Sequence, residues 1–583
     1  MKKLLAVAFL ASLILTSCET TIQESDNLSG KLTEAKGGKY YGGVFRLNES
    51  EYIKNLFPHS TIDAYSYRVS SQIYEGLLKF DQDSLTIIQS LSESYTKDET
   101  NTIYTFKLRD NVYFHDDDCF EGGKGRKLSA EDVLYSFTLA CTQIRLNQSF
   151  SLFENIVEGA NEYYAATASG QTPSFPVKGF KVIDDLTFQI KLIEPNSRFI
   201  FNLARPGAFI FPREAFEKYG PDMRTKCVGT GPFKLSSVDE DISIILKKNE
   251  KYYGKDEFGN QLPFLDALSI QFLKDKKVEL LEFRKGNLDM MYRLPTDYIF
   301  EVISSDLNEG GYGQYDLARE PEMSTQCLLF FNLGEIFNDV NVRKAFSFAV
   351  DRETILNYVL SGEGYLEGVH GITPPTFLPK YNIYNIKGFS FDRDSANYYL
   401  TKAGYPNGEG FPTVVLDINS EGDRFTNVAV ELQKQLKEHL NVNLEINMQS
   451  MAQVINKTKA GEYHFARIAW IADYPNPENY LWAFHSKNVP TSLDEESYPN
   501  LTRYRNSVFD DYYEKGLHAS STEEAFQYFM QAEQTMMQDA PVLILWYDEA
   551  YRLLQPYVRD FPNNPMQYRD FSKVYRIPEE VKN

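Results

Sequence analysis

The chain has 583 residues, of which 43% are apolar and 24% are charged. It can therefore bury a large core, which excludes a disordered segment and a small disulfide-stapled scaffold. Its formal net charge of −21 argues against electrostatic binding to nucleic acid or to an anionic membrane surface. The length predicts about three to five domain-sized units, and no apolar stretch of about 18 residues or more predicts a transmembrane helix beyond the N-terminal region.

The N-terminus has a basic start, a short apolar run at 4–15 and the letters LTSC at 15–18. This pattern predicts a secretory signal peptide over residues 1–17. The LTSC end resembles a bacterial lipobox, in which Cys18 becomes the lipidated first residue; the alternative is an ordinary signal peptide with a coincidental cysteine. We expect residues 18–38 to be the lipidated cysteine and a flexible tether. The protein would then lie outside the cytoplasm, anchored by lipid to a bacterial membrane on its periplasmic side or at the cell surface.

Four further cysteines follow in the body of the chain: Cys119, Cys141, Cys227 and Cys327. The expected compartment is oxidising and permits disulfides. Four cysteines allow three pairings, and the sequence leaves open whether one bridge forms or all four thiols stay free.

Strands and helices alternate along the chain, which predicts an α/β protein. The alternation of apolar and polar residues at 104–109 indicates a half-buried strand, and Ser129 and Asp132 are spaced to cap a helix that follows them. Further strands are expected at 180–183, 187–192, 242–246, 268–272 and 442–448, and further helices at 339–350, 352–360, 392–403 and 426–440.

Catalytic signatures are missing from the sequence. It contains no G-x-S-x-G, no H-E-x-x-H and no phosphate-binding G-x-x-x-x-G-K-[ST] motif. Residues 115–119 (HDDDC) could supply metal ligands, but a polar loop after the strand at 104–109 is the favoured interpretation. Paired carboxylates at 495–496 and 523–524 are expected on solvated faces. We therefore expect no enzyme, no metal and no cofactor.

Several segments, in chain order, resemble the extracellular solute-binding proteins of ABC importers, specifically the peptide/oligopeptide-binding family (family 5). Each segment alone is weakly specific, but their order and spacing agree. The loop between His115 and Ser129 departs from the family pattern, with 121–126 as extra residues. The matching segments are 73–78 (IYEGLL), 104–109 (YTFKLR), 114–116 with 129–133, 229–233 (GTGPF), 341–352 and 466–474 (ARIAWIADY).

The resemblance implies a type II periplasmic-binding-protein-like fold: two lobes joined by a hinge, with an extra domain inserted in the first. It also implies that a monomer captures short peptides and delivers them to an ABC permease in the inner membrane. The hinge is expected near 283–295 and 539–545. The expected parts are lobe I at 39–77, 177–286 and 541–575, the extra domain at 78–176, and lobe II at 287–540.

Residues 465–471 suit a strand, which the Asn and two prolines at 475–477 end. An acid at the tip of such a strand needs a cationic partner once a cleft closes around it. The resemblance implies that Asp473 pairs with the α-amino group of a peptide; the alternative is a turn aspartate bonded to its own backbone. We expect Asp473 to lack a protein cation until the ligand arrives.

Arg467 lies six residues earlier, on the same face of the strand and about 20 Å away. The resemblance implies that it meets the carboxylate of a short peptide, to which its fork is well suited; the alternative is an arginine that braces the cleft. The main chain of Ala469, Trp470 and Ile471 would pair with the peptide backbone. Trp470 would also form a wall for one ligand side chain, and Tyr474 is expected as a further ligand contact.

Other functions stay open from the sequence alone. Relatives on the same scaffold bind nickel chelates, haem or sugars instead of peptides. A surface glycan-binding lipoprotein is a different class, expected to be mainly helical. A secreted hydrolase would need a nucleophile and base, or a pair of acids, in the cleft.

Overall fold

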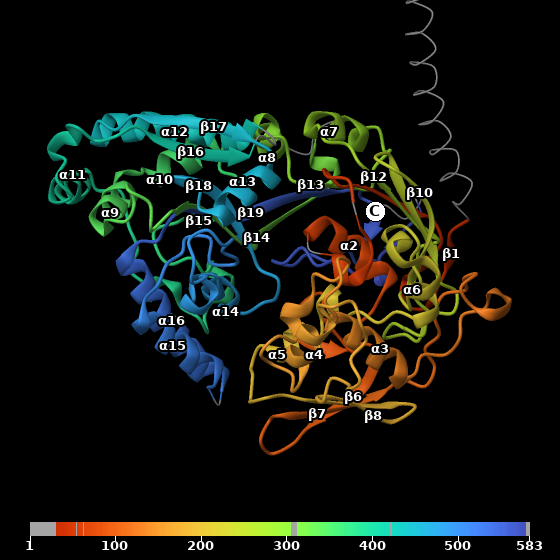
Figure 1. The fold of residues 1–583 in the computed structure, drawn as a ribbon. Helices are drawn as coiled ribbons and strands as arrows, with labels where there is room; N and C mark the ends of the chain where they lie inside the picture. The colour runs from red at the N-terminus through yellow and green to blue at the C-terminus, as the bar shows by residue number, and fades with distance from the viewer. Residues whose placement is uncertain are drawn as a thin grey trace, which may run out of the picture.

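A computed structural model describes residues 31–53, 55–61, 63–304, 312–419, 423–519 and 521–578. The predicted signal peptide and Cys18 lie outside these residues. Within them, no helix combines the length and apolar character needed to cross a bilayer. Two groups of sheets separate in space, one built mainly from the first half of the chain and one from the second (Figure 1).

The first group holds a four-stranded sheet in the order β10-β11-β12-β3. Its strands are β10 (Phe233–Asp239), β11 (Ser243–Lys248), β12 (Ala267–Gln271) and β3 (Val44–Asn48). β3 joins β12 in parallel, although the two are far apart in sequence, and the other pairs are antiparallel. All four strands fall in the ranges expected for lobe I.

A second four-stranded sheet, β6-β7-β9-β8, forms the extra domain. It contains β6 (Ser92–Lys97), β7 (Ile103–Leu108), β8 (Phe180–Asp184) and β9 (Thr187–Lys191). The expected boundary at residue 176 falls too early, because β9 pairs with β7 from Lys191 to Thr187 and brings β8 with it. The capping box of Ser129 and Asp132 is confirmed at the start of α3 (Ala130–Ala140).

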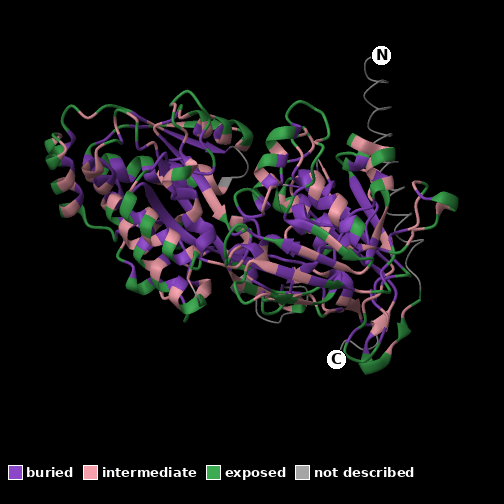
Figure 2. Ribbon diagram, turned by 60° about the horizontal axis from the view of Figure 1, so that its bottom comes forward, coloured by how far each residue is buried: buried purple, intermediate pink, exposed green. Residues whose placement is uncertain are grey.

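The second group is a seven-stranded sheet in the order β13-β19-β14-β18-β16-β17, with β15 (Leu366–Glu367) on β19. Figure 1 shows α9, α11 and α12 on one side of it and α14, α15 and α16 on the other. Most of β19 and the second half of β14 are buried between these layers, while β17 at the edge of the sheet is largely exposed (Figure 2). The strands are β13 (Met290–Tyr292), β14 (Asp316–Phe330), β16 (Val414–Asn419), β17 (Leu444–Gln449), β18 (Phe465–Ile471) and β19 (Val542–Leu554).

Two separate cores lie against this sheet because side chains alternate across each strand. Leu328 and Phe465 face a core that contains Leu432 of α12. Cys327, one residue from Leu328, and Ile468, three residues from Phe465, face a core that contains Phe529 of α16. The covering helices are α9 (Val340–Ala349), α11 (Arg393–Lys402), α12 (Asp423–Leu440), α14 (Glu478–Leu481), α15 (Ser507–Leu517) and α16 (Thr522–Asp539).

The expected lobe boundary at 541 also falls too early. β19 stays in the sheet of lobe II until Leu554, paired with β14 and β13. The chain crosses to lobe I next to Asp289, whose carbonyl accepts from the Gln555 N–H at 3.0 Å and whose N–H donates to the Arg46 carbonyl at 2.7 Å. The two crossing segments therefore lie side by side at residues 289 and 555.

The remaining elements are short and connect these layers. The strands are β1 (Thr33–Glu34), β2 (Tyr40–Tyr41), β4 (Leu78–Phe80), β5 (Ile87–Gln89), β20 (Val558–Arg559) and β21 (Tyr575–Arg576). The helices are α2 (Ala64–Ile73), α4 (Ala160–Thr167), α5 (Phe199–Asn202), α6 (Arg213–Tyr219), α7 (Lys276–Arg284), α8 (Ile299–Ser304), α10 (Arg352–Thr354) and α13 (Met451–Ala460).

The cysteines and the acidic loop have ordinary surroundings. Cys119, Cys141, Cys227 and Cys327 are all free thiols. Asp116 of the 115–119 loop is paired with Lys251 at 2.7 Å, as expected of a polar loop. Across the residues that the structure describes, no group of three or more His, Cys, Asp or Glu side chains is placed to hold a metal ion.

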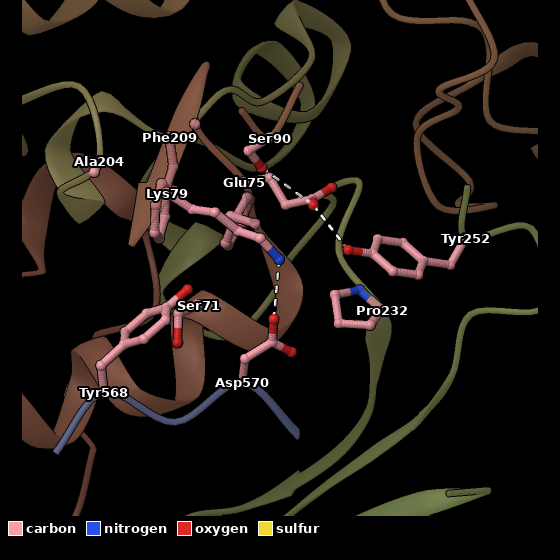
Figure 3. Close-up of a pocket in the computed structure, with 12 residues that line it drawn as sticks. Ser71, Glu75, Lys79, Ser90, Ala204, Phe209, Pro232, Tyr252, Tyr568 and Asp570 are labelled. Atoms are coloured by element: carbon pink, nitrogen blue, oxygen red, sulfur yellow. Dashed lines mark hydrogen bonds and ion pairs between the residues drawn. The ribbon is translucent and has the colours of Figure 1, made fainter. Parts of the chain in front are cut away.

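A small cavity with both polar and apolar lining residues lies between residues of the first group of sheets and the C-terminal segment (Figure 3). Glu75 lies at its wall and accepts hydrogen bonds from Thr230 Oγ1 at 2.9 Å and from Tyr253 Oη at 2.8 Å. Lys79 Nζ lies 2.9 Å from Asp570 Oδ2, with side chains 26% and 15% exposed. Because these groups satisfy one another, we assign the cavity a structural role.

Lys79→Met is expected to lower the free energy of unfolding by about 1–3 kcal/mol at pH 7, somewhat less than the loss for a fully buried pair. Burial raises the pKa of Asp570, but Lys79 outweighs burial and holds it at about 2. The pair therefore stabilises the fold above pH about 4 and loses this contribution as the pH falls through about 2. Urea unfolding across this range measures it. A loss that does not shrink at low pH would contradict this role, and the double variant with Asp570→Asn is the control.

Candidate ligand-binding site

β18 offers an incompletely paired edge. On one side it pairs with β14 along its whole length, from Phe330 opposite Phe465 to Ser324 opposite Ile471. On the other side the ladder with β16 ends at Ala466. In the described part of the chain, the edge from Arg467 to Ile471 therefore has no strand beside it.

Backbone alternation shows which groups this edge presents. The Ala472 N–H donates to the Met323 carbonyl of β14 at 2.9 Å. In an antiparallel pair, successive residues point their N–H and C=O groups to opposite edges. Ala469 and Ile471 therefore direct both groups away from β14, toward the open edge, and Ile471 is 54% exposed. The predicted backbone-pairing segment has the required geometry, although Trp470 faces β14 with its main chain.

Arg467 is 7% exposed. Its Nη1 donates to Asn419 Oδ1 at 2.8 Å and its Nη2 donates to Gln326 Oε1, while the guanidinium lies 3.5 Å from the centre of the Phe425 ring. Burial, with the nearby Arg424, lowers the pKa of Arg467 to about 9. Among the described residues, no carboxylate forms an ion pair with Arg467, and its Nε is buried without a hydrogen-bond partner.

Asp548, which acts on Arg467 only through its charge, forms ion pairs with the neighbouring arginines. It lies 2.9 Å from Arg293 and 2.8 Å from Arg424, and it accepts from Gln326 Nε2 at 2.8 Å. Burial raises the pKa of Asp548, but the two arginines lower it further, well below its usual range. Gln326 links this cluster to Arg467. Sequence reasoning missed Asp548, although an acid inside the apolar run of β19 is a signal of a buried charge partner.

Asp473 follows β18 at the end of the open edge. The expectation that it lacks a protein cation is wrong: Arg205 Nη2 lies 3.0 Å from its Oδ2, with side chains 26% and 45% exposed. Arg205 lies in the range expected for lobe I, and the residues that follow it, Ala208 and Phe209, lie in a core shared by the two four-stranded sheets and not in the cores of the seven-stranded sheet. Asp473 therefore lies where the two lobes meet.

Tyr474 is only 2% exposed. This burial contradicts the expectation that Tyr474 contacts a ligand directly. Its hydroxyl donates to Glu478, and its ring stacks on Phe201 of α5 at a centroid distance of 5.5 Å. Burial raises the pKa of Tyr474 well above its usual range. It positions the turn that carries Asp473.

Trp470 is half-buried and its Nε1 donates to Asn479 Oδ1 at 3.2 Å. The same oxygen accepts from the Asp473 N–H at 3.1 Å, so Asn479 fixes both residues. Trp470 also borders a mainly apolar pocket on the α14–α16 side of the sheet. Its other lining residues are Cys327, Leu329, Ile372, Ile468, Ala483, Phe484, Pro499, Leu501 and Thr502.

Two lobes with adjacent crossings, and a strand edge that ends where the lobes meet, define the class of two-lobe binding proteins. The chain matches the family model for bacterial extracellular solute-binding proteins, family 5 Middle, over residues 86–491. The chain belongs to this family.

Relatives of the chain match nearly its full length. It is 25% identical over 573 residues to Heme-binding protein A of Haemophilus influenzae, covering 97% of each protein. It is 24% identical over 566 residues to the periplasmic oligopeptide-binding protein OppA of Salmonella typhimurium, covering 96% of this chain and 95% of that protein. The periplasmic binding protein DppA from Helicobacter pylori, solved with the peptide STSA, has the same fold. Its TM-score is 0.75 at 23% identity, over 92% of this chain and 98% of that one.

Proposed function

We propose that this protein captures short peptides between its lobes and delivers them to an ABC permease in the membrane. The observation that carries the proposal is the open edge of β18, where Ala469 and Ile471 offer main-chain donors and acceptors. A peptide can add to such an edge as an extra strand. Every peptide offers these backbone bonds, so we expect the site to bind peptides of many sequences and not one particular sequence. The peptide-bound relative and the named oligopeptide-binding relative support this reading.

A charged residue at each end of the open edge, Arg467 and Asp473, completes the site. Arg467 lacks a protein carboxylate among the described residues, and a peptide carboxylate matches its bidentate geometry. Asp473, about 20 Å farther along the strand, is assigned to the peptide α-amino group. A three- or four-residue backbone is shorter than this span, so the Arg467 side chain must lean along the strand. The pocket beside Trp470 suits an apolar ligand side chain.

Ligand binding would act through hinge closure. A peptide that bridges the lobes shifts an open–closed equilibrium. Moving that population from 1:99 to 99:1 needs about 5.5 kcal/mol of preference for the closed state. Two charge-assisted bonds and several backbone bonds are a sufficient source. No step of this mechanism breaks a covalent bond, so the role is transport and not catalysis.

The same proposal includes the location of the protein. Cys18 would carry the lipid anchor, and the residues between it and β1 would tether a monomer to the membrane from outside the cytoplasm. The expected tether of residues 18–38 is too long, because β1 (Thr33–Glu34) pairs with β2 (Tyr40–Tyr41). Lobe I, the extra domain and lobe II would comprise the ranges expected from the sequence, with two changes. The end of the extra domain moves from residue 176 to beyond β9, and the end of lobe II moves from residue 540 to beyond β19.

Native mass spectrometry of the protein as purified tests the ligand class. We expect bound components that leave on denaturation and fragment into amino-acid residues in tandem spectra. A porphyrin, a metal chelate or a sugar as the bound mass would overturn the peptide assignment, and the haem-binding relative makes haem the first of these to check.

A further inference from the structure

A segment of lobe I crosses the gap and touches the turn that carries Asp473. Arg205 pairs with Asp473 at 3.0 Å, and its guanidinium lies 5.7 Å from the centre of the Tyr474 ring. Arg198, on the same segment, lies 3.5 Å from Glu478. We call residues 198–205 and 473–478 together the lobe seam.

The two ion pairs of the lobe seam differ in burial. Glu478 is 1% exposed and also accepts from the hydroxyls of Tyr474 and Tyr513, so its pair is locked among hydrogen bonds. Asp473 is 45% exposed, and solvent-exposed pairs are weak. The lobe seam therefore combines a fixed pair, Arg198–Glu478, with the Arg205–Asp473 pair, in which another cation can replace Arg205.

We propose that Arg205 occupies the place of a ligand's positive end in the ligand-free protein, holds the cleft partly shut, and competes with an incoming ammonium group for Asp473. This inference rests on the proposed function, in which Asp473 receives the peptide amine. Arg205 is then a specificity-determining residue: an amine must displace it, and its charge stays close enough to oppose the amine afterwards.

Competition has a measurable signature. With Arg205 present, acetylating a peptide removes an interaction that Arg205 has already weakened, so the loss of affinity is small. In Arg205→Gln the carboxylate is open to the amine alone, and the ratio of affinities for free and acetylated trialanine should rise roughly three- to tenfold. Arg205→Lys keeps the charge and is the matched control, with a ratio close to that of the parent.

We call the Arg205–Asp473 pair, in its role of holding the cleft partly shut, the inter-lobe latch. Small-angle X-ray scattering tests the latch without ligand, on protein freed of bound material by unfolding and refolding. We expect Arg205→Gln, Asp473→Asn and the double variant to show the same shift to a larger radius of gyration, because each removes the same pair. Unchanged radii of gyration in all three variants would show that the Arg205–Asp473 pair does not hold the lobes together. An unchanged affinity ratio in Arg205→Gln would show that Arg205 does not compete with the peptide amine.

The two proposals fail in different ways. If neither parent nor Arg205→Gln binds trialanine while the scattering shift occurs, and native mass spectrometry finds no peptide, the proposed function falls and the inter-lobe latch stands. If peptides bind but neither the ratio nor the radius responds to Arg205→Gln, the inference falls alone.

Discussion

Arg467→Met is expected to weaken binding of a free-carboxylate peptide about 100-fold, or about 2.7 kcal/mol, and to leave the melting temperature at or above that of the parent. The guanidinium is buried, has no carboxylate partner among the described residues and has an unsatisfied Nε. Burying such a charge costs stability, and methionine fills similar space on the Phe425 ring. Calorimetry with trialanine and trialanine amide measures the binding effect, since the amide lacks the carboxylate.

Arg424→Met is the matched control for this prediction. Arg424 is also buried, with a side chain 12% exposed, but it pairs with Asp548 at 2.8 Å. Its removal leaves a buried carboxylate with less compensation, so this variant should lose about 3–5 kcal/mol of stability. A melting temperature that falls in Arg467→Met as far as in Arg424→Met would show that Arg467 is a structural brace, the alternative left open from the sequence.

Local patterns predicted the elements of the site well. The mainly apolar run at 465–471 and the prolines at 475 and 477 predicted β18 and its turn, because strand formation and proline geometry depend on neighbouring residues. Ser129 and Asp132 predicted the start of α3 for the same reason, and short segments carried the family resemblance. These are signals that a few adjacent residues can hold.

Partners distant in sequence were not predictable. Arg205 and Asp473 are 268 residues apart, and nothing near either residue indicates the other. The burial of Tyr474 likewise depends on Phe201, from the other lobe. The boundaries at 176 and 541 failed because β9 and β19 pair with strands from an earlier part of the chain. Which carboxylate stays free for a ligand is thus a property of the assembled lobes.

Ile471→Pro is expected to weaken peptide binding by about 1–3 kcal/mol, roughly five- to 150-fold, with little change in melting temperature. Proline removes one backbone N–H. At residue 471 that N–H points to the open edge and not to β14, so the fold loses no ladder bond while a ligand carbonyl loses its donor. The preceding Trp470 is already in a strand, the conformation that proline favours for its neighbour.

Ala472→Pro reverses this pattern and provides the control. The Ala472 N–H donates to the Met323 carbonyl at 2.9 Å, so proline there breaks the ladder with β14 and should lower the melting temperature. Comparing the two variants by calorimetry with trialanine and by thermal unfolding separates ligand pairing from sheet integrity. Equal affinity of Ile471→Pro and the parent would exclude strand addition at this edge. A peptide held only by its charged ends would still depend on Arg467, so Arg467→Met and Ile471→Pro together decide whether the main chain of β18 or the terminal charges provide the affinity.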